Sequence, residues 1–183
     1  MVKMQEDGTV MPPEWTEEAL LAAMQSVAAP HSCCYLAGPL TTSETALMGR
    51  ADLSLAEIES RNRARMQEIA GNLRRHLTYP VIDSSVLQVP GWAGSDYGRF
   101  FLRVIEKLCF EIRFINGWEY SMGATKEFVY SQELRISCFD ENGAGLTVDA
   151  GIKLIENAVR RMESVGIENS RYVGRLLSLR ELQ

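Results

Sequence analysis

The sequence predicts an α/β fold, in which a parallel sheet carries helices on both faces and further helices follow at the C-terminus. Short apolar segments, typical of buried strands, alternate with longer segments whose apolar residues recur at helical spacing. Gly, Pro, Asn and Asp separate these segments, as expected of connections. Strands that alternate with helices pair in parallel, because each crossover helix returns the chain to the same edge of the sheet.

The predicted strands are short and mostly apolar. The first is a run of five apolar residues that ends at Gly38–Pro39, and the second ends at Asp83 and two serines. We expect four strands, at Cys33–Ala37, Tyr79–Ile82, Phe110–Ile115 and Arg135–Phe139.

The predicted helices have recognisable beginnings. Thr16 is expected to cap the first helix, and Glu17 and Glu18 suit the positive first turn of that helix. A small, polar segment, Thr41–Asp52, is expected to be a mobile loop. The expected helices are Trp15–Val27, Ser54–Leu77, one that begins at Asp96, Gly123–Glu133, one that runs from a cap at Thr147 or Asp149 to about Ser164, and Ser170–Leu182.

The length of 183 residues suits one domain with peripheral additions. Residues 1–30 are predicted to be an N-terminal tail and a short helix. Residues 31–145 form the expected α/β domain, and residues 146–183 form a helical extension that packs on it.

Composition narrows the classes of function. The formal net charge of −5 argues against a nucleic acid polymer as partner, because binding a polymer of phosphates requires a basic surface. No apolar run approaches the 20 or so residues of a membrane span, and no signal peptide is recognisable, so we expect a cytoplasmic protein without a membrane partner. Four cysteines and two histidines show no zinc-binding spacing, and no GxGxxG follows the first strand. We therefore expect neither metal nor dinucleotide cofactor.

The segment from the third strand to Glu127 is the most informative for chemistry. A Gly-containing loop leads into a helix near Gly123, whose free N–H groups can hold an anion, and Ser121 can add a hydroxyl. Glu127 lies about one turn further along, where its carboxylate can reach the same pocket. A carboxylate can attack the anomeric carbon of a sugar. The same pattern is also what ordinary helix capping and a favourable helix-dipole contact produce.

Two motifs resemble the nucleoside 2-deoxyribosyltransferase superfamily. Tyr35–Pro39 (YLAGP) is similar to its opening motif, and Asn116–Glu127 (NGWEYSMGATKE) is similar to its signature loop and helix. The similarity is greatest to a bacterial and phage branch of unknown function, which also shows an early helical Asn, here Asn62, and an extended segment like Val81–Asp83. The resemblance spans roughly residues 33–140.

The resemblance implies a Rossmann-like, flavodoxin-like sheet and chemistry at an N-glycosidic bond. It implies that Glu127 is the nucleophile on the sugar and that Asp96 binds the sugar or handles the leaving base. It also implies that Tyr35 and Gly38 line the floor of the pocket and that Ser121 contacts a 5′-phosphate. The expected substrate-binding residues are Tyr35, Gly38, Pro39, Asp83, Trp118, Ser121 and Gly123. Ser121, Gly123 and Glu127 reproduce the Ser-x-Gly-x-x-x-Glu spacing of the nucleotide-hydrolysing members of the superfamily. The resemblance therefore implies a nucleoside 5′-monophosphate rather than a free nucleoside.

Several points stay open at the level of sequence. The nucleotide-hydrolysing members of the superfamily carry an arginine soon after the glycine that ends the first strand. This sequence has no arginine at that position, and the nearest one is Arg50. Trp118 either lines a base pocket or packs the loop, and the leaving base takes its proton from Asp96 or Asp83. The resemblance implies a homodimer or higher homo-oligomer. The alternatives to an enzyme are a nucleotide-binding or sensing module with the same pocket, and an interaction protein whose pocket is vestigial.

Overall fold

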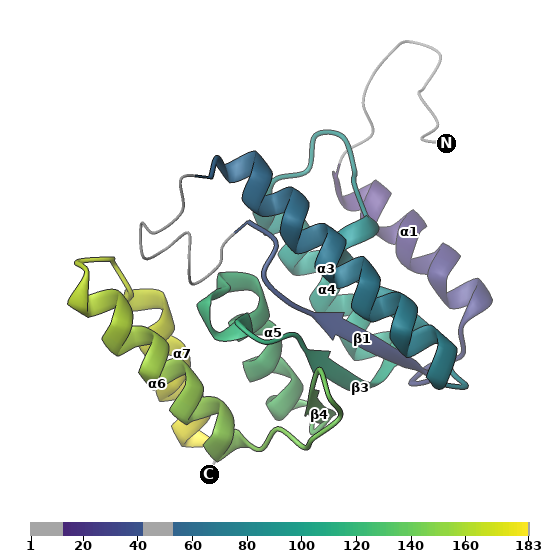
Figure 1. The fold of residues 1–183 in the computed structure, drawn as a ribbon. Coiled ribbons are helices and arrows are strands. Elements are labelled where there is room, and N and C mark those ends of the chain that lie inside the picture. Colours follow the sequence, from purple (N-terminus) through teal and green to yellow (C-terminus); the bar gives the residue numbers. More distant parts are fainter. Residues whose placement is uncertain (1–12, 42–52, 183) are drawn as a thin grey trace.

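A four-stranded, all-parallel sheet forms the centre of the molecule (Figure 1). The computed structural model describes residues 13–41 and 53–182, so the expectations for Thr41–Asp52 and Arg50 fall outside the described residues, apart from Thr41 itself. The strands are β1 (Cys33–Ala37), β2 (Val81–Asp83), β3 (Cys109–Phe114) and β4 (Ser137–Asp140). Their order is β2-β1-β3-β4, and every neighbouring pair is parallel. The predicted fold class is confirmed.

Two of the strands begin later than predicted, because the residues before them cannot adopt or complete the hydrogen-bonding pattern of the sheet. β1 matches the predicted residues, whereas β2 begins two residues later than expected. Pro80 has no N–H to donate, although its carbonyl accepts a 2.9 Å hydrogen bond from the Cys34 N–H. Arg135 has a positive φ of 56°, which is incompatible with a strand, and β4 therefore begins only at Ser137.

The helices follow the predicted order, with shifted ends. Thr147 caps α6, with its hydroxyl accepting from the Ala150 N–H. The expected cap at Thr16 is wrong, because the first helix already begins at Pro13, a residue favoured at a first helical position. The helices are α1 (Pro13–Val27), α3 (Leu55–His76), α4 (Gly94–Leu108), α5 (Met122–Glu133), α6 (Val148–Ser164) and α7 (Ser170–Glu181), with 3-10 turns η1 (Ser84–Val86) and η2 (Trp118–Tyr120).

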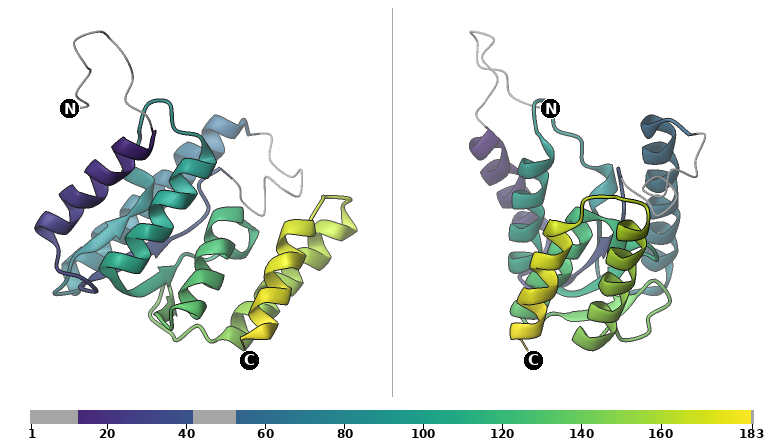
Figure 2. Two further views of the ribbon diagram at one scale, coloured as in Figure 1. Left: turned by 180° about the vertical axis from the view of Figure 1, so that it is seen from behind. Right: turned by 90° about the vertical axis from the view of Figure 1, so that its left-hand side faces the viewer.

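Helices cover both faces of the sheet, as Figures 1 and 2 show. α3 packs on one face, where side chains such as Leu36 and Met66 form the smaller core cluster. α4 and α5 pack on the other face and enclose the larger cluster, which contains Tyr35 and Phe128. Alternation along β1 therefore sends Tyr35 to the α4–α5 face and Leu36 to the α3 face.

The two C-terminal helices lie against α5 rather than against the sheet (Figure 2). Their buried side chains, among them Met162 and Leu179, belong to the same cluster as the α4–α5 core. Gly151 makes the close approach of α6 to α5 possible. A Cβ at that position would lie 2.2 Å from Cε1 of Phe128, so a larger residue cannot fit without movement.

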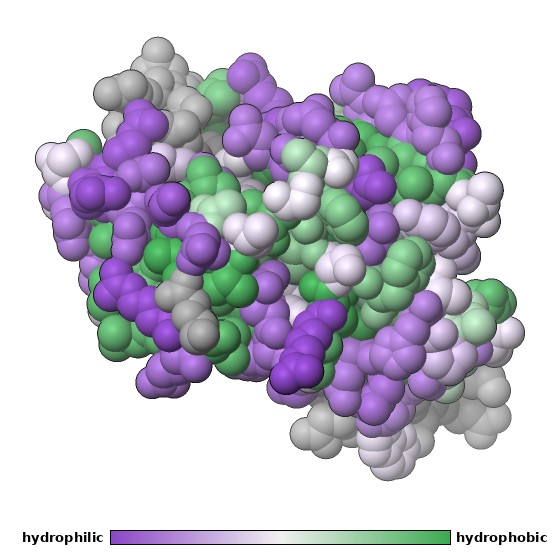
Figure 3. Space-filling view, turned by 90° about the horizontal axis from the view of Figure 1, so that it is seen from below, coloured by the Kyte–Doolittle hydropathy of each residue, from purple (hydrophilic) through white to green (hydrophobic). Residues whose placement is uncertain are grey.

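The outer edge of β4 is occupied by the chain that follows it. The Leu146 N–H donates to the Cys138 carbonyl, and the Asp140 N–H donates to the Ala144 carbonyl, each over 2.8 Å. Figure 3 shows that the face seen from below carries hydrophobic residues interspersed with hydrophilic ones. Within the described ranges, no helix combines the length and apolar composition that crossing a membrane requires.

Candidate functional site

Tyr35 and Glu127 are hydrogen bonded to each other at the candidate site. The Tyr35 hydroxyl donates to Oε1 of Glu127 over 2.8 Å. Tyr35 belongs to β1 and is fully buried, whereas Glu127 lies in the second turn of α5 and is partly buried. The carboxyl ends of parallel strands are where α/β proteins bind ligands, and α5 begins just beyond the carboxyl end of β3. Two residues that the sequence predicted for one site are thus brought together.

The surroundings of Glu127 favour its neutral form. Burial raises the pKa of Glu127 to about 7, although the hydrogen bond from Tyr35 and the nearby positive charge of Lys126 both act to lower it. Burial and the neighbouring Glu127 raise the pKa of Tyr35 well above its ordinary value. Tyr35 therefore stays protonated and donates, while Glu127 can exchange its proton near neutral pH.

The start of α5 presents hydrogen-bond donors next to this pair. Ser121 is the N-cap, and its hydroxyl accepts a 3.3 Å hydrogen bond from the Ala124 N–H. The Thr125 N–H donates to the Ser121 carbonyl over 2.9 Å. The N–H groups of Met122 and Gly123, at the first two helical positions, have no intrahelical acceptor by helix geometry. The predicted cap and donor group at Ser121 and Gly123 are thus formed in the first turn of α5.

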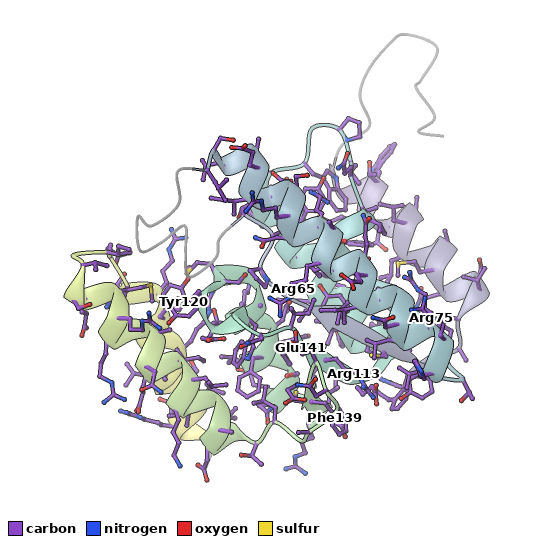
Figure 4. All side chains as sticks on the ribbon, in the orientation of Figure 1. Arg65, Arg75, Arg113, Tyr120, Phe139 and Glu141 are labelled. Atoms are coloured by element: carbon purple, nitrogen blue, oxygen red, sulfur yellow. The ribbon has the colours of Figure 1, made fainter. Side chains whose placement is uncertain are left out.

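The loop that precedes α5 is anchored from a distance. The Asn116 N–H donates to Oε2 of Glu141 over 3.1 Å, and Arg65 of α3 contacts the Asn116 carbonyl. Arg65 and Glu141 also form an ion pair of 2.9 Å, and Figure 4 shows the two side chains next to each other. Gly117 has a φ of 91°, a conformation that suits glycine.

Trp118 takes the packing alternative. It is 3% exposed and its ring lies 4.9 Å from that of Phe114 and 4.8 Å from that of Phe128. The indole therefore fills the core beneath the loop and is not available to line a base pocket.

Gly38 and Pro39 form the turn that leaves β1. A Cβ on Gly38 would lie 3.2 Å from Cβ of Ile115, so the glycine permits a close approach of two segments. Asn62 of α3 donates a 2.9 Å hydrogen bond to the Leu40 carbonyl and holds the turn. Asn62, the early helical Asn of the resemblance, thus contacts the segment that follows Tyr35–Pro39.

Asp83 lies on the other face of the sheet from Tyr35. It pairs with Leu36 in the parallel register, and paired residues share a face. Its Oδ1 accepts from the Ser85 N–H over 2.9 Å, whereas its buried Oδ2 and the buried Ser85 hydroxyl have no hydrogen-bond partner among residues 13–41 and 53–182. This register separates Asp83 from Glu127 and does not support it as the acid for a leaving base at Glu127.

Asp96 is engaged in capping and ion pairing. One carboxylate oxygen accepts from the Ala93 N–H over 2.8 Å, and the other lies 3.1 Å from Arg99. Arg99 in turn pairs with the buried Glu17 of α1, over 2.5 Å. Among the described residues, no hydrogen bond joins Asp96 to Tyr35 or Glu127.

Ser84 lies in the segment that ends the second predicted strand, a place where a ligand site is expected. It is buried, and its hydroxyl lies beside that of Tyr35. Tyr172 and Arg175 of α7 bind the turn that carries Ser121 and were not anticipated from the sequence. Polar residues in a terminal helix carry no local signal, since only tertiary packing brings them to the site.

An open groove of about 450 Å³ lies elsewhere, at the amino end of the strands. His31 lies just before β1, and Cys109 begins β3, so this groove is at the opposite edge of the sheet from Glu127. It is lined by His31, Glu106, Lys107, Cys109, Phe110, Leu134, Arg135 and Ile136. The four cysteines are free, buried thiols. Across the described ranges, no group of three or more His, Cys, Asp or Glu side chains is placed to hold a metal ion.

Comparisons with protein-family models, with curated proteins and with solved structures find no match to this chain.

Proposed function

We propose that the protein cleaves or transfers the N-glycosidic bond of a nucleoside or nucleoside 5′-monophosphate, with Glu127 as the nucleophile. The observation that carries this proposal is the 2.8 Å hydrogen bond by which the Tyr35 hydroxyl fixes Oε1 of the partly buried Glu127 carboxyl. Perturbed carboxyl groups beside a fixed donor are typical of catalytic sites.

The two oxygens of Glu127 have different tasks in this mechanism. Oε1 is held by the Tyr35 hydroxyl, which leaves Oε2 of the ionised carboxylate to attack C1′ of the sugar as the bond to the base breaks. The base leaves with the bonding electron pair and takes up a proton from water. The transition state carries positive charge on the sugar, which an adjacent carboxylate stabilises. A water molecule or a second base then attacks C1′ and releases Glu127, which gives hydrolysis or transfer.

The first turn of α5 would bind the 5′-phosphate. Ser121 and the N–H groups of Met122 and Gly123 supply donors about one helical turn from Glu127. A phosphate held there would orient the sugar, so that binding energy remote from C1′ contributes to catalysis.

A nucleotide-binding module without turnover is the second candidate. It is favoured by the same pKa of about 7, because a carboxyl group that is half protonated at neutral pH binds a sugar hydroxyl well and attacks poorly. The two candidates predict the same ligand and differ in the product.

The test is incubation of the full chain with deoxynucleosides, deoxynucleoside 5′-monophosphates and ribonucleoside 5′-monophosphates, followed by chromatography of free base. We expect base release that falls by at least about a thousandfold in Glu127→Gln. Glu68→Gln, on the exposed side of α3, is the control and retains activity. Base release that persists in Glu127→Gln would overturn the proposed nucleophile. Thermal stabilisation by a nucleotide without base release would favour the binding module.

A further inference from the structure

Two side chains of α7 contact the turn that starts α5. The Tyr172 hydroxyl donates to the Tyr120 carbonyl over 2.7 Å, in a buried contact. Nη1 of Arg175 lies 2.7 Å from Oγ1 of Thr125 and 3.5 Å from Sδ of Met122. Tyr172 and Arg175 are three residues apart and therefore share one face of the helix. Figure 4 shows Tyr120 on the side of the loop that faces the C-terminal helices.

These contacts converge on the peptide groups around Ser121. Thr125, which is fully buried, donates its hydroxyl to the Ser121 carbonyl over 2.9 Å. The chain Arg175–Thr125–Ser121 and the bond from Tyr172 therefore fix two successive carbonyls, those of Tyr120 and Ser121. Glu127 follows in the next turn, where its N–H bonds to the carbonyl four residues earlier, so its place depends on this first turn.

The charge of Arg175 has no carboxylate to balance it within the part of the chain that the structure describes. Burial lowers the pKa of Arg175, the neighbouring Tyr172 acts in the opposite direction, and the nearby Arg171 adds a smaller lowering effect. A guanidinium that is partly withdrawn from water without a counterion costs free energy. Arg113, which is also partly buried, pairs with Glu111, whereas Arg175 contacts the neutral Thr125 hydroxyl.

We propose that α7 is a working part of the site, with Tyr172 and Arg175 as positioning residues that hold Ser121 and Glu127 in their mutual geometry. The inference rests on the proposed function for its kinetic consequence, whereas the placement of Glu127 can be measured without turnover. Displacement of a reacting group by about 1 Å lowers rates by about a hundredfold.

The experiment compares Tyr172→Phe and Arg175→Met with Arg175→Lys and with Tyr130→Phe. Tyr130 lies at the far end of α5, and its hydroxyl makes a 3.4 Å contact with Glu106, so this control also removes one phenol hydroxyl from a hydrogen bond. We expect kcat to fall by about tenfold or more in the first two variants with a smaller change in KM, and partial recovery in Arg175→Lys, since lysine can still donate to Thr125.

A second readout is the titration of the Glu127 carboxyl by NMR in each full-length variant. Tyr35 and Lys126 are the groups that face this carboxyl electrostatically, and both remain in place. Loosening of the turn admits water, and the midpoint in Tyr172→Phe then moves from about 7 toward the ordinary value by about one pH unit.

An unchanged Glu127 midpoint and unchanged kcat in folded Tyr172→Phe and Arg175→Met would overturn the positioning role. If the wild-type chain releases no base, the proposed activity fails, and the titration alone decides whether α7 positions Glu127. A shifted midpoint supports the inference in that case too.

Discussion

Tyr35 and Glu127, which are 92 residues apart in sequence, share one hydrogen bond between β1 and α5. The phenol stays protonated because burial and the neighbouring carboxyl raise its pKa, and the carboxyl retains a proton up to about pH 7. Burial is the main cause of both shifts, and the hydrogen bond from Tyr35 opposes the shift at Glu127. Two measurable consequences follow from this pair, and two others concern the packing of α6 and α7 and the start of α4.

Removal of the Tyr35 hydroxyl is expected to raise the pKa of Glu127 above 7. The hydrogen bond stabilises the ionised carboxylate, so Tyr35→Phe shifts the equilibrium toward the neutral acid. The acidic limb of the pH–rate profile then moves to higher pH, and kcat at pH 7 falls by about a hundredfold. The profile of kcat against pH checks this. An unshifted limb would show that Tyr35 does not hold Glu127.

The stability of the chain is expected to depend on pH through Glu127. The pKa of Glu127 is about 7 in the folded chain against 4.5 for the ordinary side chain, so the native state binds the extra proton between these values. Stability therefore falls as pH rises from about 4.5 to about 7, by about 3 kcal/mol, and then levels off.

Glu127→Gln lacks this contribution and is expected to be more stable than the wild type at pH 8, with little difference at pH 4.5. Urea unfolding at the two pH values measures the change, and exposed Glu68→Gln corrects for charge removal elsewhere. Equal pH dependence in wild type and Glu127→Gln would contradict the prediction.

Substitution of glycine by alanine is expected to have opposite effects on stability at Gly151, where α6 contacts α5, and at Gly174 in α7. Gly151→Ala places a methyl group against Phe128 and is expected to cost about 1–3 kcal/mol. Gly174, in α7, has no atom within 4 Å of such a methyl, so Gly174→Ala is expected to stabilise by up to about 1 kcal/mol. Denaturant unfolding measures the free energy of unfolding of both variants. A Gly151→Ala variant as stable as the wild type would contradict the close contact of α6 with α5.

Asp96 is expected to act mainly through stability. Asp96→Asn weakens the contact with Arg99 and reduces the negative charge at the start of α4, at a cost of about 1 kcal/mol. Thermal unfolding measures this loss, and base release measures any loss of activity. A fall in kcat far beyond the loss of stability would restore the catalytic role that the resemblance implies.

Local patterns predicted elements well and tertiary contacts poorly. Cys33–Ala37 was recognisable because burial on both faces of a parallel strand requires an unbroken apolar run. The helix expected at Ser54–Leu77 is α3, and the structure adds a capping pair of Ser54 and Glu57 at its start. β4 was misplaced because of the positive φ of Arg135, which the sequence does not display. The late start of β2 follows from Pro80, whose missing N–H is readable from the sequence.

The candidate site was predictable only where a motif spans it. Tyr35, Ser121 and Glu127 were named from their motifs, and the structure pairs the first with the last. Asp96 and Arg99 are a local pair, three residues apart in α4, which the spacing alone could have indicated. The core position of Trp118 and the contact of Arg175 with Thr125 instead join different elements. Such contacts depend on how helices pack, and spacing along the chain does not encode them.

The return of the chain along β4 has a consequence for assembly. Because Leu146 and Ala144 already satisfy Cys138 and Asp140, this margin offers few unpaired amides to a foreign strand. Copies of the chain are therefore protected at this margin from joining into extended ribbons, and any association there has to proceed through side chains.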